Sequence, residues 1–92
     1  MEYERIFSFL IDQLVRNAIS IGDNVVEGKP GSWRKDWMNF FVIALKSANE
    51  TKYWLCLIRD TMSVSKPKIA GLIKEADEIS KILASIIINK AD

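Results

Sequence analysis

The stretch WMNFFVIALKSANETKYWLCLIRDTM, residues 37–62, decides the fold. Apolar and small side chains recur along it in alternating steps of four and three, which is the helical period. The members of this series are Trp37, Phe41, Ala44, Ala48, Thr51, Leu55, Ile58 and Met62. An uninterrupted series of this kind is typical of the seam along which one helix packs in a bundle. The sequence therefore predicts a long helix here.

Proline and glycine interrupt the chain on either side of this helix. The first break is Gly28-Lys29-Pro30-Gly31-Ser32, and the second runs from Met62 to Pro67. The outer segments that these breaks separate also carry apolar side chains at helical spacing. We therefore predict helices over residues 2–27, 32–61 and 66–90, and no strand.

The predicted fold class is all-α. Because short connections make consecutive helices antiparallel neighbours, we expect an up-and-down helical bundle of three long helices in a single domain, residues 1–92. In this bundle the central seam should meet apolar residues of both outer helices. We expect Phe41, Ala44, Ala48, Leu55 and Ile58 to face Leu14, Ala18, Leu72, Ile79 and Leu83.

Composition excludes several classes of function. The chain has no histidine, so mechanisms that need an imidazole base or ligand are excluded, and its one cysteine, Cys56, cannot form an internal disulfide. No glycine-rich phosphate loop is present, and the carboxylates of Asp77 and Glu78 should face outward. We expect no enzyme, no catalytic residues, no cofactor and no metal site. The acidic N-terminus and the lack of long apolar runs favour a cytoplasmic protein without a membrane partner.

The central helix has more apolar surface than two neighbours can cover. Beside the main seam runs a second line, which contains Phe40, Ile43, Trp54 and Leu57. A helix that is apolar nearly all round requires burial on most sides. Either a missing fourth helix or a neighbouring subunit covers this line. We expect a homo-oligomer with these four residues at the subunit interface.

Basic residues gather around the first break. Arg16, Lys29, Arg34 and Lys35 could form a patch that binds phosphates, with Trp33 and Trp37 placed to stack on bases. The alternative is a solvated turn, with Trp37 in the core and Trp33 against a neighbour. A net charge of +1, from thirteen basic and twelve acidic residues, does not favour strong salt-dependent binding.

Four blocks of sequence carry a family resemblance: Ser20-Ile-Gly-Asp-Asn-Val-Val-Glu27, Trp37, Ile43-Ala-Leu45 and Glu50-Thr-Lys-Tyr-Trp-Leu55. In this combination the chain resembles the bacterial four-helix-bundle family named for proteins encoded in intervening sequences of large-subunit ribosomal RNA genes. The similarity runs without a gap from Leu10 to Ile58 and more loosely to Lys90.

The resemblance implies an up-and-down bundle that assembles as a ring, commonly a pentamer. The family looks related to the accessory protein of diversity-generating retroelements, which binds nucleic acid and a reverse transcriptase. No enzymatic activity follows from it. Members usually have a further helix before the matching region. Either that helix is lost here or the start of the chain is misassigned. If it is lost, we expect a neighbouring chain to complete the bundle, in a ring or in a dimer.

Two hypotheses for the function follow. The first is a nucleic-acid-associated accessory module, with RNA or DNA and a reverse transcriptase as partners. The second is a protein–protein interaction scaffold that binds no nucleic acid.

Overall fold

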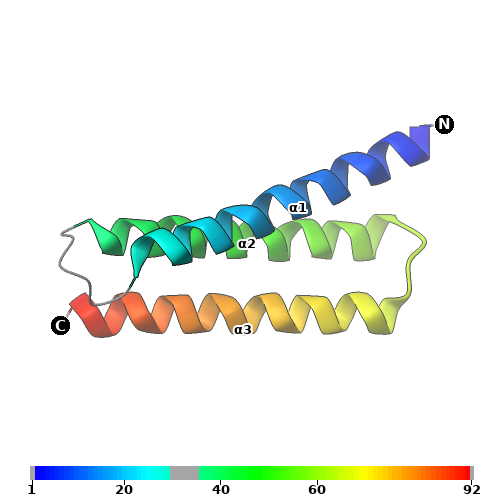
Figure 1. Ribbon diagram of the computed structural model, residues 1–92. Helices are drawn as coiled ribbons and strands as arrows, with labels where there is room; N and C mark the ends of the chain where they lie inside the picture. Colours follow the sequence, from blue (N-terminus) through cyan, green and yellow to red (C-terminus); the bar gives the residue numbers. More distant parts are fainter. Residues whose placement is uncertain (1, 30–35, 92) are drawn as a thin grey trace.

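The computed structural model describes residues 2–29 and 36–91. Within these ranges the chain forms three helices and no strand (Figure 1). They are α1, Glu2–Gly28; α2, Trp37–Thr61; and α3, Lys66–Ala91. The predicted all-α class and the three predicted helices are confirmed. The expected start of the second helix, Ser32, lies outside the described residues.

The helix ends follow from local backbone chemistry. After α1, Lys29 adopts a left-handed conformation with φ 40°, and its N–H donates to the Val25 carbonyl at 3.4 Å. After α2, Met62 is extended, and its N–H donates to the carbonyl of Ile58 at 2.9 Å. The helix α3 then begins with Pro67 in its first turn, where a missing N–H costs little.

The helix α2 is the centre of the molecule. The helices α1 and α3 both pack against α2, each antiparallel to it, while no close backbone approach joins α1 to α3 within the described residues (Figure 1). The molecule is correspondingly flat, with principal extents of 50 × 22 × 14 Å. Its shape is that of an open layer of helices, with two broad faces.

Two apolar clusters stabilise this layer, one at each end. The first joins the beginning of α1, the end of α2 and the beginning of α3; its buried members are Leu10, Leu55, Ile58, Met62, Ile69 and Ala76. The second joins the start of α2 to the last part of α3; its buried members are Trp37, Phe41, Ala44, Ala48 and Leu83. The predicted core residues of α2 are therefore buried, as expected.

A polar layer separates the two clusters. Ser20 on α1 and Ser47 on α2 share a hydrogen bond of 2.9 Å. Asn24 donates to the carbonyl of Ser20 at 2.7 Å, and Thr51 donates to the carbonyl of Ser47 at 2.9 Å. On α3, the buried Oγ of Ser80 has no hydrogen-bond partner. The contact between α1 and α2 thus combines apolar packing with a few hydrogen bonds near its middle.

For three residues, the prediction that they face the seam of α2 is wrong. Leu72 is 49% exposed and Ile79 is 41% exposed, and Ala18 is exposed as well. On α3 the face toward α2 is rotated, because Ser80 rather than Ile79 occupies the buried position. On α1, Asn17 rather than the neighbouring Ala18 is buried, and its side-chain amide donates a hydrogen bond to the Gln13 carbonyl at 3.0 Å.

Candidate interaction surfaces

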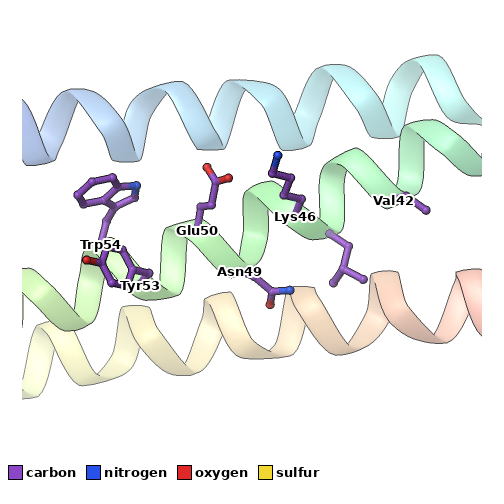
Figure 2. A pocket seen from close by; sticks show the side chains of 7 residues that line it. Val42, Lys46, Asn49, Glu50, Tyr53 and Trp54 are labelled. Atoms are coloured by element: carbon purple, nitrogen blue, oxygen red, sulfur yellow. The ribbon is translucent and has the colours of Figure 1, made fainter.

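The face of α2 that points away from the core carries a shallow open hollow. Its volume is about 660 Å³, and its lining is mostly apolar (Figure 2). Seven side chains line it, all from α2: Val42, Leu45, Lys46, Asn49, Glu50, Tyr53 and Trp54. We call this surface the α2 outer face. It lies between α1 and α3 along the middle of the layer (Figure 2).

Aromatic rings form one end of the α2 outer face. The ring of Trp54 meets Phe9 of α1 edge to face, with centroids 6.0 Å apart, and meets Tyr53 at 5.2 Å. These contacts fix the indole while Tyr53 remains 61% exposed and Phe9 54% exposed. Exposed aromatic groups on a rigid platform are the groups that contribute most at protein interfaces.

Two opposite charges lie in the middle of this surface. Lys46 and Glu50 are both exposed, and neither makes an ion pair or side-chain hydrogen bond with any described residue. Their i, i+4 spacing would allow a pair along the helix, yet the side chains stand apart (Figure 2). Both charges are therefore free to meet groups of another molecule.

The charges on the flank of α3 are different, because they are already paired. Asp77 receives Lys52 of α2 at 3.2 Å and Lys81 of α3 at 3.0 Å. The hydrogen bond from Lys81, followed by that from Lys52, lowers the pKa of the Asp77 carboxyl below its ordinary value. The Asp77 side chain is 41% exposed, in line with its expected outward position, and it also bridges two helices.

The four residues predicted for a subunit interface have unequal exposure. Trp54 and Leu57 are half-buried against the first apolar cluster of their own chain. Phe40 is also half-buried, and its Cβ lies near Gly28. Ile43 is 46% exposed. Only Ile43 of this set presents its side chain largely to solvent.

The four predicted nucleic-acid-binding residues are only partly described. Arg16 and Lys29 are exposed and lie on or just after α1, about 20 Å apart along the helix at 1.5 Å per residue. Arg16 also pairs with Asp12 at 2.9 Å. Arg34 and Lys35, like Trp33, lie outside the described residues. The structure therefore does not bring Arg16 and Lys29 together into one compact cluster.

Trp37 belongs to the core. It is 6% exposed and meets Phe41 edge to face, with ring centroids 5.6 Å apart. Of the two interpretations open for this residue, packing in the core is the one observed, and stacking on a base is not available to it.

The described residues contain no group of three or more side chains of His, Cys, Asp or Glu able to hold a metal ion. Cys56 is half-buried. No helix in the described part of the chain is long and apolar enough to cross a lipid bilayer.

Residues 4–85 match the protein family described as 23S rRNA-intervening sequence protein. The chain belongs to that family. Its fold is also similar to the 1.70 Å crystal structure of a Bacteroides thetaiotaomicron VPI-5482 protein with unknown function from the S23 ribosomal protein family. The sequences are 34% identical, the TM-score is 0.74, and the similarity covers 94% of this chain and 88% of that chain. No curated protein matches the chain.

In this member of the 23S rRNA-intervening sequence protein family, the quoted sequence blocks contribute to different parts of the structure. The first block supplies Ser20 and Asn24 to the polar layer. Trp37 anchors the second apolar cluster. The last block supplies Glu50, Tyr53 and Trp54 to the α2 outer face.

The sequence interpretation missed Tyr53 as a surface-forming residue. Tyr53 follows the apolar residues Val42 and Leu45 at intervals that place them on one side of α2. This spacing was the feature of the sequence from which the position of Tyr53 on this surface could have been predicted. The prediction instead placed the interface on the neighbouring line of residues, which the chain's own helices partly cover.

Proposed function

We propose that this protein is a non-enzymatic, homo-oligomeric helical-bundle module that accompanies nucleic acid. The observation that carries the proposal is the family match over residues 4–85, because the family's description refers to 23S rRNA. The similar Bacteroides protein is named for a ribosomal protein family, which supports the same class of partner. The protein would act in the cytoplasm, beside RNA or DNA and a protein such as a reverse transcriptase.

Basic residues along α1 and in the segment that follows it would contact the phosphates. Arg16 and Lys29 are exposed in the structure, and Arg34 and Lys35 follow in the sequence. One chain with a net charge of +1 should bind weakly by itself. Several copies in one assembly would raise the effective strength of such weak sites, provided that one nucleic acid can reach more than one of them.

Self-association is supported by the exposed apolar side chains of the layer. On α1 these include Ile11, Val15, Ile19 and Val26, with exposures between 39% and 66%. On α3, Leu72, Ile79 and Ile82 add to the apolar surface. Burying such surface is favourable by about 25 cal/mol per Å². Association would therefore lower the free energy of a chain that has two broad faces and this many exposed apolar groups.

Fluorescence anisotropy with labelled 23S rRNA fragments tests the nucleic-acid proposal. The affinity should fall steeply as the salt concentration rises, since binding to phosphates releases counterions. Changing Arg34 and Lys35 together to Glu should weaken binding and reduce the salt slope by about one for each phosphate that is no longer neutralised. Lys68→Glu is the matched control, because Lys68 is an exposed lysine of α3 remote in sequence from this junction. No binding at low salt would contradict the proposal.

The alternative function is a protein–protein interaction scaffold without nucleic acid. The aromatic α2 outer face favours it, since Tyr53 and Phe9 are exposed on a rigid helical surface. This alternative would be established by three results together. The assembly forms normally, it binds no RNA or DNA, and it retains a protein partner after nuclease treatment.

A further inference from the structure

The helix α1 carries a second line of residues beside the one that packs on α2. The packed line includes Leu10, Leu14 and Asn17, which are buried or half-buried. The residue that follows each of them along the chain is exposed, and these residues are Ile11, Val15 and Ala18. Because consecutive residues are about 100° apart around a helix, the exposed line is rotated by roughly a quarter turn from the packed one.

The helix α3 shows the same arrangement with the opposite offset. Its packed line includes Ile73, Ala76, Ser80 and Leu83, which are buried or half-buried. The residue that precedes each of them is exposed, and these residues are Leu72, Glu75, Ile79 and Ile82. The exposed line of α3 is therefore rotated from its packed line by the same angle as on α1, in the opposite sense.

The two exposed lines point to the same side of the layer. The helices α1 and α3 are both antiparallel to α2, so they run parallel to each other on its two flanks (Figure 1). Opposite rotations on opposite flanks turn both lines toward one broad face. We call this surface the α1–α3 face; its residues are Ile11, Val15, Ala18, Leu72, Glu75, Ile79 and Ile82.

The α2 outer face lies on the other broad face. The helix α2 meets α1 through Ser47 and α3 through Lys52, and its buried residue Ala48 lies between these two contacts around the helix. The right-handed sense of the helices turns the α1–α3 face to the side of Ala48. Lys46 and Tyr53 lie on the opposite arc of α2. Each copy of the chain thus has two unlike exposed surfaces, directed to opposite sides.

We propose that the α2 outer face of one copy docks on the α1–α3 face of the next copy. The incoming α2 then takes the place of a fourth helix, between α1 and α3 and antiparallel to both. The proposal rests on the self-association proposed above and names its two surfaces. Because each copy offers one surface and receives the other, the contact is head-to-tail, and such a contact closes into a ring when its rotation allows. A ring is the assembly that the family resemblance implies.

One pair of opposite charges matches across this contact. Glu75 lies within the exposed line of α3, and Lys46 lies in the α2 outer face. Both are exposed, and neither makes an ion pair with any described residue. With the incoming α2 antiparallel to α3, a register that sets Lys46 level with Glu75 also sets Val42 level with Ile79. One register therefore pairs the two charges and brings two exposed apolar side chains together.

The contact would cover the apolar surface that the single chain leaves in water. Leu72 is 49% exposed and Ile82 is 60% exposed, and no other helix of the described chain lies over them. Soluble monomers rarely expose large contiguous apolar patches, and a bundle helix normally packs along more than one line. Docking of one helix between α1 and α3 would give each of these two helices its second neighbour.

Mixing two variants tests the head-to-tail contact in the full chain. Tyr53→Glu impairs the α2 outer face, and Ile79→Glu impairs the α1–α3 face, so each variant alone should be monomeric at concentrations where the original chain assembles. An equimolar mixture should form a complex of two chains, because the intact outer face of the Ile79→Glu chain docks on the intact α1–α3 face of the other. Size-exclusion chromatography with light scattering measures these masses.

Ile88→Glu is the matched control. Ile88 is 62% exposed on the same helix, but it follows the packed residue Ile87 and so lies on the other side of α3 from the exposed line. It should leave the assembly unchanged. Circular dichroism should show the original helix content in all variants, and Ile82→Glu replaces Ile79→Glu if the latter loses helix content. A mixture that forms no complex, or a Tyr53→Glu or Ile79→Glu chain that assembles like the original, would overturn the contact.

Charge exchange tests the orientation. Sedimentation equilibrium should show that Lys46→Glu and Glu75→Lys each weaken association by about tenfold or more, since like charges then meet. The two residues lie on opposite faces of one chain, so they can pair only between copies. The double variant should therefore return association to within about threefold of the original. A double variant as weak as the single ones would overturn the proposed pairing and leave self-association intact, whereas a monomeric original chain would overturn both proposals.

Discussion

Gly28, the last residue of α1, lies directly against the ring of Phe41 on α2. A Cβ atom at this glycine would stand 2.6 Å from Cε2 and 2.8 Å from Cδ2 of that ring. Phe41 is 1% exposed, so its ring lies inside the packed core. The end of α1 can approach α2 at this point only because the residue has no side chain.

Gly28→Ala should therefore destabilise the protein, by about 1–3 kcal/mol, because overpacking forces neighbouring groups apart. Urea denaturation followed by circular dichroism, at one fixed protein concentration, measures the free energy of unfolding. Gly22→Ala is the control, since a Cβ there meets nothing within 4 Å. That change should stabilise α1 by up to about 1 kcal/mol. Equal effects of the two substitutions would contradict the close approach.

The hydrogen bond between Ser20 and Ser47 should couple the two residues energetically. Ser47 is 7% exposed, so Ser20→Ala would leave a nearly buried hydroxyl short of its partner. A double-mutant cycle with Ser20→Ala and Ser47→Ala should give a coupling of about 0.5–1.5 kcal/mol. Strictly additive free energies of unfolding would show that the hydroxyl pair does not contribute to the register of α1 on α2.

The rotation of α3 predicts different effects for two leucines of the same helix. Leu83 is 4% exposed, and Leu83→Ala should cost about 2–5 kcal/mol, since it creates a cavity in the second apolar cluster. Leu72 is 49% exposed, and Leu72→Ala should cost less than about 1 kcal/mol. Thermal or urea unfolding at low protein concentration measures the loss of stability caused by each substitution. A larger loss of stability at Leu72 would favour the face that the sequence pattern predicts for this helix.

Acid should weaken the bridge from α2 to α3 through Asp77. Its pKa is lowered, chiefly by the hydrogen bond from Lys81 and then by that from Lys52. A carboxyl with a lowered pKa stabilises the folded chain above its ordinary value of 3.8, and this contribution is lost as the pH falls through the lower, folded-state value. The free energy of unfolding should therefore fall more steeply below about pH 4 in the original chain than in Asp77→Asn. Parallel curves would contradict the bridge.

The helices and the seam of α2 were predictable because the physical signals are local. Glycine and proline mark both connections, and the alternating steps from Trp37 to Met62 place one face of α2 in the core. The face of α3 was not predictable in the same way, because isoleucine and leucine cover much of its circumference. The pattern cannot distinguish Ile79 from Ser80, and the buried position belongs to the polar residue.

The candidate surfaces were less predictable than the fold. The excess of apolar surface on α2 was evident from composition, but its location depends on how far α1 and α3 cover each flank. Trp54 packs on Phe9, which lies 45 residues away in the sequence, and no local pattern encodes that contact. Of the basic residues, Arg16 and Lys29 were expected to act together, yet the length of α1 separates them.

The central position of α2 has a consequence for the order in which parts of the protein open. No close backbone approach joins α1 to α3 within the described ranges, so the backbone contacts of α1 and those of α3 are each made with α2. The detachment of α2 would break both sets of backbone contacts at once, whereas the detachment of α1 or α3 would break only one set. Amide hydrogens in the middle of α2 should therefore exchange with deuterium only when the whole chain unfolds, while those of α1 and α3 exchange through smaller, separate openings.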